Sequence, residues 1–126
     1  MSKRINQSDH DRMVKTVADH YLKNNQFIVN ADISGYDKPK KIIWKGQSSG
    51  HIPDVEIYVE KDCKMIVEVE TEDSINESHT TDQWKLFSVF AIENKAKFLI
   101  VVPKGFEGIA EKRKIELQII GEIIGI

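Results

Sequence analysis

Two stretches of sequence decide the fold of this chain: Ile52-Pro53-Asp54-Val55-Glu56-Ile57 and, after a short polar break, Met65-Ile66-Val67-Glu68-Val69-Glu70. Polar and apolar residues alternate along both, which predicts two β-strands with acids on one face and branched apolar residues on the other. The break Lys61-Asp62-Cys63 is typical of a three-residue hairpin loop. In the register that keeps valines opposite valines, the acids pair as Glu56 with Glu68 and Asp54 with Glu70.

This concentration of carboxylates on neighbouring strands needs an explanation other than stability. Like charges directly opposite one another on a sheet repel, so four acids gathered in this way destabilise an empty site. A divalent cation is the simplest explanation, because carboxylate oxygens are its preferred ligands. The two strands therefore predict a metal site.

Pro53-Asp54 at the start of one strand and Glu68-x-Glu70 at the end of the next resemble the active-site signature of the PD-(D/E)XK nuclease superfamily. Members usually carry lysine where Glu70 stands here, although some restriction endonucleases of the superfamily also show Glu-x-Glu. The resemblance implies divalent-metal-dependent hydrolysis of phosphodiester bonds in DNA, that is, an endonuclease with Mg²⁺ or Mn²⁺ as its cofactor.

The resemblance also implies roles for particular residues. The metal ligands would be Asp54, Glu68, Glu70 and the backbone carbonyl of Val69. Glu70 would hold a second metal ion or act as general base. On the next helix, Lys85 would replace the missing lysine, and Gln83 resembles a glutamine that several branches of the superfamily place near the site. Ordinary solvent-facing positions remain open for both.

The remaining elements follow the order of the superfamily core. Periodicity predicts helices over 8–24, 80–94 and 105–114, and further strands over 26–33, 97–102 and 116–124. The loop 34–50 is rich in glycine, serine and lysine, with a short strand at 41–44. The sum is an α/β fold with a restriction endonuclease-like αβββαβ core, a mixed sheet, and a C-terminal helix and strand. Its layout is most similar to the small archaeal Holliday-junction resolvases.

Length and composition favour one domain over 1–126, because 126 residues with 40% hydrophobic content can bury one core and leave no room for a second. No apolar run is long enough to span a bilayer, and the polar start Met1-Ser2-Lys3-Arg4 lacks the apolar block of a signal peptide. We therefore expect a cytoplasmic protein without a membrane partner. Cys63, placed in the hairpin loop, is interpreted as an incidental thiol.

Charge is informative only locally, since 18 basic residues face 20 acids for a net charge of −2. The loop before Pro53 leads directly into the acidic site and carries Lys38, Lys40, Lys41 and Lys45. Trp44 in this loop either stacks on a base or packs on the core. A second basic group at 112–114 is either solvated surface or a phosphate contact.

Weaker candidates have ordinary alternatives. Glu56 is a metal-site residue or a common strand glutamate, and Asp11 resembles an acid of the family's first helix or stabilises a helix start capped by Ser8. The four histidines show no zinc spacing, and His51 is interpreted as a loop residue.

Three hypotheses follow. The first is a Mg²⁺-dependent nuclease that acts on DNA as a homodimer, since so small a chain otherwise cuts one strand per encounter. The second is a lapsed nuclease fold that serves as a nucleic-acid-binding or assembly module, with Glu70 as the discriminating residue. The third is an unrelated α/β fold whose acids form a solvated face.

Overall fold

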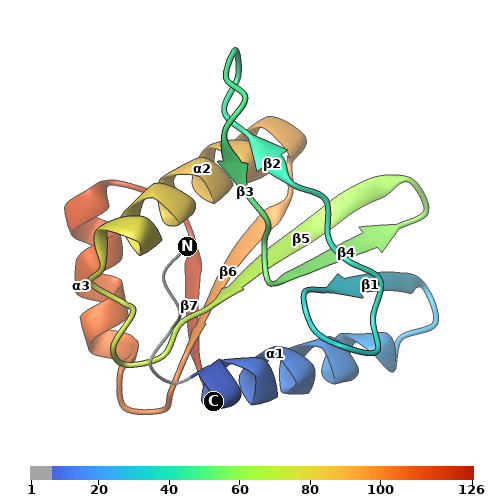
Figure 1. The fold of residues 1–126 in the computed structure, drawn as a ribbon, viewed down its shortest axis with the longest axis horizontal. Helices are drawn as coiled ribbons and strands as arrows, with labels where there is room; N and C mark the ends of the chain where they lie inside the picture. The colour runs from blue at the N-terminus through green and yellow to red at the C-terminus, as the bar shows by residue number, and fades with distance from the viewer. Residues whose placement is uncertain (1–6) are drawn as a thin grey trace.

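The structure, a computed structural model, describes residues 7–126 and arranges them as a mixed β-sheet with helices on both faces (Figure 1). The elements in chain order are α1 (Gln7–Leu22), β1 (Phe27–Ala31), β2 (Ile42–Ile43), β3 (Gly50–His51), β4 (Val55–Val59), β5 (Asp62–Val69), α2 (Ser78–Asn94), β6 (Lys97–Val102), α3 (Glu107–Leu117) and β7 (Glu122–Gly125).

The main sheet has five strands in the order β1-β4-β5-β6-β7. The β1–β4 and β4–β5 pairs are antiparallel, whereas β5–β6 and β6–β7 are parallel, with α2 and α3 as the crossovers. The predicted α/β fold with a mixed sheet, begun by three antiparallel strands, is therefore confirmed. A small ribbon of β2 and β3 stands apart from this sheet.

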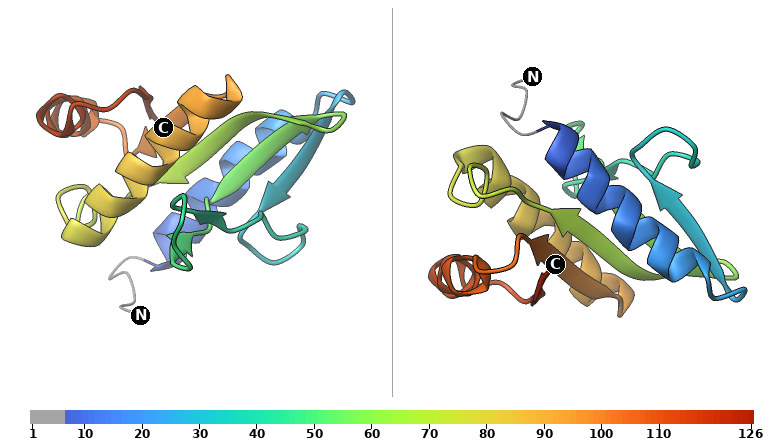
Figure 2. Two further views of the ribbon diagram at one scale, coloured as in Figure 1. Left: turned by 90° about the horizontal axis from the view of Figure 1, so that it is seen from above. Right: turned by 90° about the horizontal axis from the view of Figure 1, so that it is seen from below.

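Helices cover both faces of the sheet, as the two views of Figure 2 show, and each face has its own apolar core. Helix α1 covers one face and packs on the odd-numbered residues of β4 and β5, including Val55 and Val67. Helices α2 and α3 cover the other face, where Ile66 and Ile100 are buried. Since side chains alternate along β5, Glu68 shares the face of Ile66 and lies beneath α2. The predicted acidic face is thus covered by a helix and is not open to solvent.

The predicted register of the hairpin is wrong by two residues. Glu56 pairs with Ile66 and not with Glu68, because the turn has two residues, 60–61, and β5 already begins at Asp62. Glu60 adopts the left-handed conformation (φ 56°). The sequence does not predict this conformation, because no glycine stands at the turn. A bulge after Ile57 adds a further irregularity. Continued past Val55, this register brings Asp54 level with Glu68, so the predicted opposition of Asp54 and Glu70 is also wrong.

Several element boundaries also differ from the prediction. Helix α3 runs to Leu117, so β7 begins at Glu122 and not at 116. Cys63 lies within β5 and is half-buried, which raises the pKa of its thiol to about 11. His51 belongs to β3 rather than to a loop. Ser8 lies inside α1, which already includes Gln7, and so does not cap it.

Other expectations concern exposure and the membrane. Trp44 packs against the α2-side core. Helix α2 buries its inner face and leaves Ile92 60% exposed on its outer face. Within residues 7–126, no helix combines the length and the apolar character needed to cross a bilayer. The start Met1–Arg4 lies outside the described residues.

Candidate active site

A groove of about 490 Å³ lies where α1 and α2 begin, at the end of the sheet from which β4 starts. We call it the Asp54 groove. Its polar lining comes from both helices, from the strand start and from the loop before β2, and includes His10, Lys38, Lys41, Asp54, His79 and Gln83. The loop 52–54, which the sequence singled out, therefore forms part of a real hollow.

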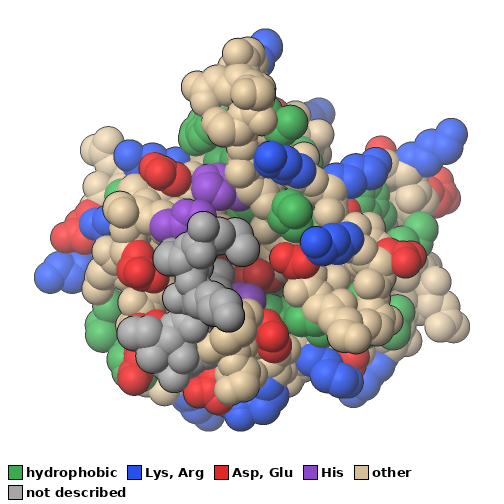
Figure 3. All heavy atoms as spheres, viewed as in Figure 1, with side chains coloured by type: hydrophobic (Ala, Val, Ile, Leu, Met, Phe, Trp, Pro, Cys, Tyr) green, Lys and Arg blue, Asp and Glu red, His purple; other side chains and the backbone are tan. Residues whose placement is uncertain are grey.

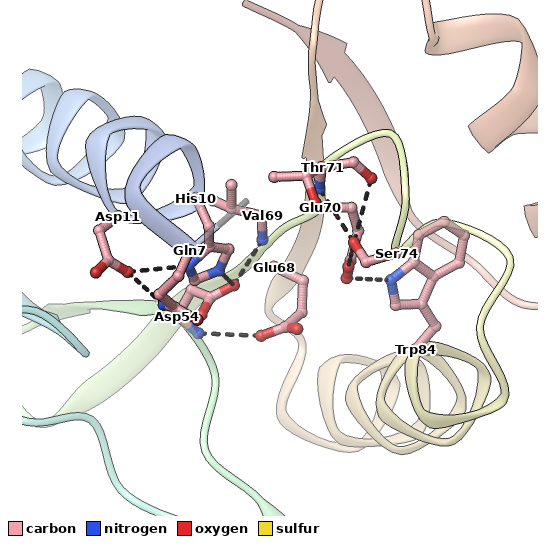
Figure 4. A network of polar contacts seen from close by, with 10 residues as sticks. All are labelled: Gln7, His10, Asp11, Asp54, Glu68, Val69, Glu70, Thr71, Ser74 and Trp84. Atoms are coloured by element: carbon pink, nitrogen blue, oxygen red, sulfur yellow. Dashed lines mark hydrogen bonds and ion pairs between the residues drawn. The ribbon is translucent and has the colours of Figure 1, made fainter. Parts of the chain in front are cut away.

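Asp54 and Glu68 are held together by the backbone around them. The Asp54 N–H donates to Glu68 Oε1 at 3.0 Å, and the Val69 N–H donates to Asp54 Oδ2 at 2.7 Å (Figure 4). Both side chains are buried, with Asp54 6% exposed and Glu68 fully covered. Among the described residues no hydrogen bond reaches Asp54 Oδ1. The pair therefore combines a firmly oriented carboxylate with one oxygen available to a ligand.

His10 is the functional candidate that sequence reasoning missed. Its Nε2 lies 3.2 Å from Asp54 Oδ2, its Nδ1 lies 3.1 Å from Asp11 Oδ1, and its side chain is buried. The available signal was helical spacing, because His10 falls on the stripe of Met13, Val14 and Val17 that packs on the sheet. A histidine on an apolar stripe needs a polar partner, and here it has two carboxylates.

Glu70 is fully buried, and its carboxylate forms its hydrogen bonds away from Asp54. Its Oε1 accepts the Ser74 hydroxyl at 2.7 Å, and its Oε2 accepts the Trp84 indole N–H at 3.0 Å. Figure 4 shows these contacts grouped apart from the His10–Asp54–Glu68 set. Both oxygens of Glu70 are thus engaged in joining β5 to α2.

The donor set at Asp54 fits a hard divalent cation in part. Two carboxylates with nearby backbone carbonyls suit Mg²⁺ or Mn²⁺, which bind oxygen and keep several waters. Asp54 and Glu68 would hold such an ion with the carbonyl of Val69, whereas Glu70 is not gathered with them. In the described part of the chain, no three His, Cys, Asp or Glu side chains already form a metal cluster.

The two helix residues differ in their placement. Gln83 lines the groove and is 7% exposed, and its Oε1 has no hydrogen-bond partner among the described residues. A buried amide oxygen without a partner costs free energy unless a ligand or water satisfies it. Lys85 is exposed and does not line the groove. The structure therefore places Gln83 in the Asp54 groove and Lys85 on the solvent-facing side of α2.

A histidine pair borders the same groove. The rings of His51 and His79 meet edge to face with their centroids 5.3 Å apart. Burial lowers the pKa of His51, and the nearby His79 and Lys41 lower it further, while Asp82 opposes them. On the face shown in Figure 3, histidine and acidic side chains meet near the middle of the view. This rim can donate hydrogen bonds to an anionic ligand.

Two weaker candidates have structural partners. Glu56 is buried and accepts from the Asn30 side chain, the Lys40 backbone N–H and the Tyr58 hydroxyl. Arg113 of the second basic group donates to Thr81 Oγ1 at 2.6 Å, and this bond ties α3 to α2.

Comparison with protein families, with curated proteins and with solved structures gave no match for this chain.

Proposed function

We propose that this chain hydrolyses phosphodiester bonds in DNA with Mg²⁺ or Mn²⁺, as an endonuclease that acts as a homodimer. The observation that carries the proposal is the buried Asp54–Glu68 pair, of which Asp54 lines a groove that also has Lys38, Lys41 and Gln83 in its wall. A divalent ion held by this pair would polarise the phosphate, lower the pKa of a bound water and offset the charge that develops in the transition state.

The chain's own residues prepare the site for an anionic substrate. His10 and the Val69 N–H both contact Asp54 Oδ2, which fixes the plane of the carboxylate. The unsatisfied Gln83 Oε1 can accept a hydrogen bond from a sugar hydroxyl or from a water bound at the site. Helix α2 begins at the groove, and the positive end of its dipole favours a phosphate there. Lys41 adds a positive charge to the same wall.

One observation favours the second candidate, a lapsed nuclease fold that binds nucleic acid or supports an assembly. The position that carries lysine in most of the superfamily holds Glu70, and both of its oxygens are occupied by Ser74 and Trp84. A general-base or second-metal role for Glu70 requires that these bonds open. Lys85 would also need to reach the groove from an exposed position.

A cleavage assay separates the two candidates. The purified protein is incubated with plasmid, linear, branched and single-stranded DNA, in Mg²⁺ or Mn²⁺ and with a chelator. We expect cleavage that the chelator stops and that Asp54→Asn and Glu68→Gln abolish, while the exposed control Glu72→Gln retains it. Circular dichroism checks that each variant folds. Wild-type protein that binds DNA but cleaves no form of DNA or RNA supports the lapsed fold and overturns the nuclease.

A further inference from the structure

A second hollow, of about 520 Å³, lies at the opposite end of α2 from the Asp54 groove. We call it the lysine cleft. It is lined by lysines from the loop before β2, the β4–β5 turn, β5 and the end of α2, together with two aromatic rings: Lys40, Lys61, Lys64, Lys95, Tyr58 and Phe90. Four separate segments therefore bring positive charge to one place.

The charge of this cleft is not neutralised within the described residues. No ion pair there involves any of the four lysines, and Asp62 is the one acid among the described lining residues. Lys95 also offsets the negative carbonyl end of α2. Figure 3 shows lysine side chains spread over the β4–β5 hairpin on the same face as the Asp54 groove. Four lysines against one lining acid leave an excess of positive charge, which favours a phosphate-bearing ligand.

The aromatic part of the cleft indicates which kind of phosphate-bearing ligand. Tyr58 is half-buried, its hydroxyl donates to Glu56 Oε2 at 3.3 Å, and Lys40 Nζ lies 5.9 Å from its ring centroid. The ring is thereby held in place beside the cation. Burial and Glu56 raise the pKa of Tyr58 to about 12, so the ring stays uncharged beside an anionic ligand. Lysines interleaved with aromatic rings are typical of grooves that bind single-stranded nucleic acid.

The size and position of the cleft exclude a duplex inside it. Its volume is in the range of pockets for small ligands, about 300–1,000 Å³, and so admits single nucleotides. Helix α2 spans the distance between the two hollows, and its lining residues nearest to each other, Gln83 and Phe90, lie about 10 Å apart along the helix axis. The loop before β2 touches both, since Lys38 and Lys41 line the Asp54 groove and Lys40 lines the lysine cleft. This loop therefore provides a basic connection between them.

We propose that the lysine cleft binds the phosphates and one base of a single-stranded nucleic acid segment whose continuation enters the Asp54 groove. The proposal rests on the proposed function in one respect, the use of the Asp54 groove for the scissile bond. Binding at the cleft itself requires neither metal nor hydrolysis, so the two can be tested apart.

The test measures binding of a labelled single-stranded oligonucleotide of about 12 nucleotides by fluorescence anisotropy, with a chelator present to stop cleavage. The cleft variant is Lys61→Gln/Lys64→Gln/Lys95→Gln. Gln118 adopts the same left-handed conformation as Lys95, so glutamine is tolerated there. The matched control is Lys15→Gln/Lys23→Gln/Lys104→Gln, which removes the same charge from exposed positions outside both hollows.

We expect the cleft variant to bind at least tenfold more weakly, and the slope of log K against log salt to fall by about 2, since each single-strand phosphate contributes about 0.7. The control should stay within about twofold. Tyr58→Leu should weaken binding about tenfold and Tyr58→Phe should not, because stacking needs the ring and not the hydroxyl. The proposal is overturned if the cleft variant and the control variant weaken oligonucleotide binding equally. It is also overturned if duplex DNA or a free mononucleotide binds as tightly as the single strand and loses as much affinity in the cleft variant.

A parallel cleavage assay in Mg²⁺ keeps the two proposals distinguishable. If Asp54→Asn abolishes cleavage but the cleft variant binds the oligonucleotide as well as wild type, the proposal for the lysine cleft is wrong and the nuclease proposal stands. If the cleft variant loses oligonucleotide binding and the wild type cleaves nothing, the nuclease proposal is wrong and the proposal for the lysine cleft is supported.

Discussion

Glu70 decides how the site differs from the superfamily it resembles. Its buried carboxylate is held by the Ser74 hydroxyl and the Trp84 indole, an environment arranged for an anion or a neutral acceptor. A lysine here would place an ammonium group opposite two donors. Placing a lysine at this position should therefore harm this protein.

We expect Glu70→Lys to destabilise the fold by about 3–5 kcal/mol, because it leaves an uncompensated buried charge, and to give no gain in cleavage. Glu70→Gln keeps the shape and one acceptor oxygen, so it should cost about 1–2 kcal/mol. Urea unfolding gives the stabilities, and the plasmid assay gives activity. A stable Glu70→Lys protein that cleaves faster than wild type would show that the position is a catalytic one awaiting its lysine.

His51 predicts a pH dependence of stability. Its pKa in the folded state lies below the ordinary 6.5 because of burial, His79 and Lys41. The unfolded chain therefore binds more protons below pH 6.5, and the stability present above that pH is lost as the pH falls through the folded pKa. Wild type should lose more stability between about pH 7.5 and about pH 5.5 than His51→Gln does, measured by urea unfolding. His20→Gln, on the exposed side of α1, is the control and should lose as much as wild type.

At the scale of residues, the sequence could identify two acids that lie together in the structure but not all of their partners. Alternation and the Pro53-Asp54 motif were enough to single out Asp54 and Glu68, which the structure joins. The contacts of His10 and Trp84 could not be predicted, because both come from helices far away in sequence. Such contacts depend on how a helix rotates over the sheet, and hydrophobic periodicity fixes that rotation only coarsely.

At the scale of elements, the polar contacts between β5 and α2 act as a tether inside an apolar interface. Trp84 is fully buried and gives its indole N–H to Glu70, while Thr80 donates to the Ser74 carbonyl at 2.7 Å. These bonds fix the start of α2, and with it Gln83, relative to the end of β5. The geometry of the Asp54 groove therefore depends on this tether.

Trp84→Phe should destabilise the protein by about 1–3 kcal/mol, because it removes the buried hydrogen bond from the indole N–H to Glu70 Oε2. Combined with Glu70→Ala, it should cost less than the sum of the two single changes, since both remove the bond between the Trp84 indole and the residue 70 carboxylate. Urea unfolding of the two single variants and the double variant measures this coupling. Strict additivity would show that the indole contributes through packing alone.

Elements with strong periodicity were predicted well, and elements that depend on turns were not. The strand Lys97–Val102 matches its predicted bounds because Pro103 ends the apolar run 98–102 and the left-handed Lys95 ends α2 just before the strand. The hairpin register failed because Glu60 adopts a left-handed conformation without glycine. The start of β7 was predicted wrongly for a similar reason. Gln118 ends α3 in the same left-handed conformation, and it lies in an isoleucine-rich segment whose composition predicts a strand.

At the scale of the whole molecule, the fold gathers its polar chemistry at one end of the sheet. Two helix starts, one strand start and one strand end meet around Asp54, and the chain between them supplies the groove's lysines. Burial of Asp54 and Glu68 there carries a cost in free energy, because their charges leave water. A cation that binds the native pair and not the unfolded chain would offset that cost.

This argument predicts that divalent ions stabilise the whole fold. At a concentration ten times the dissociation constant, Mg²⁺ or Mn²⁺ should add about 1.4 kcal/mol and raise the melting temperature by about 5 °C. Asp54→Asn should abolish the rise, because it removes a charged ligand, whereas the exposed control Glu72→Gln should keep it. Differential scanning calorimetry over a metal titration measures both. A metal site at Asp54 and Glu68 would be contradicted if isothermal calorimetry detects no divalent-ion binding at about millimolar concentration, both with and without DNA. Gln83 and the lysines would then be parts of a metal-independent binding surface.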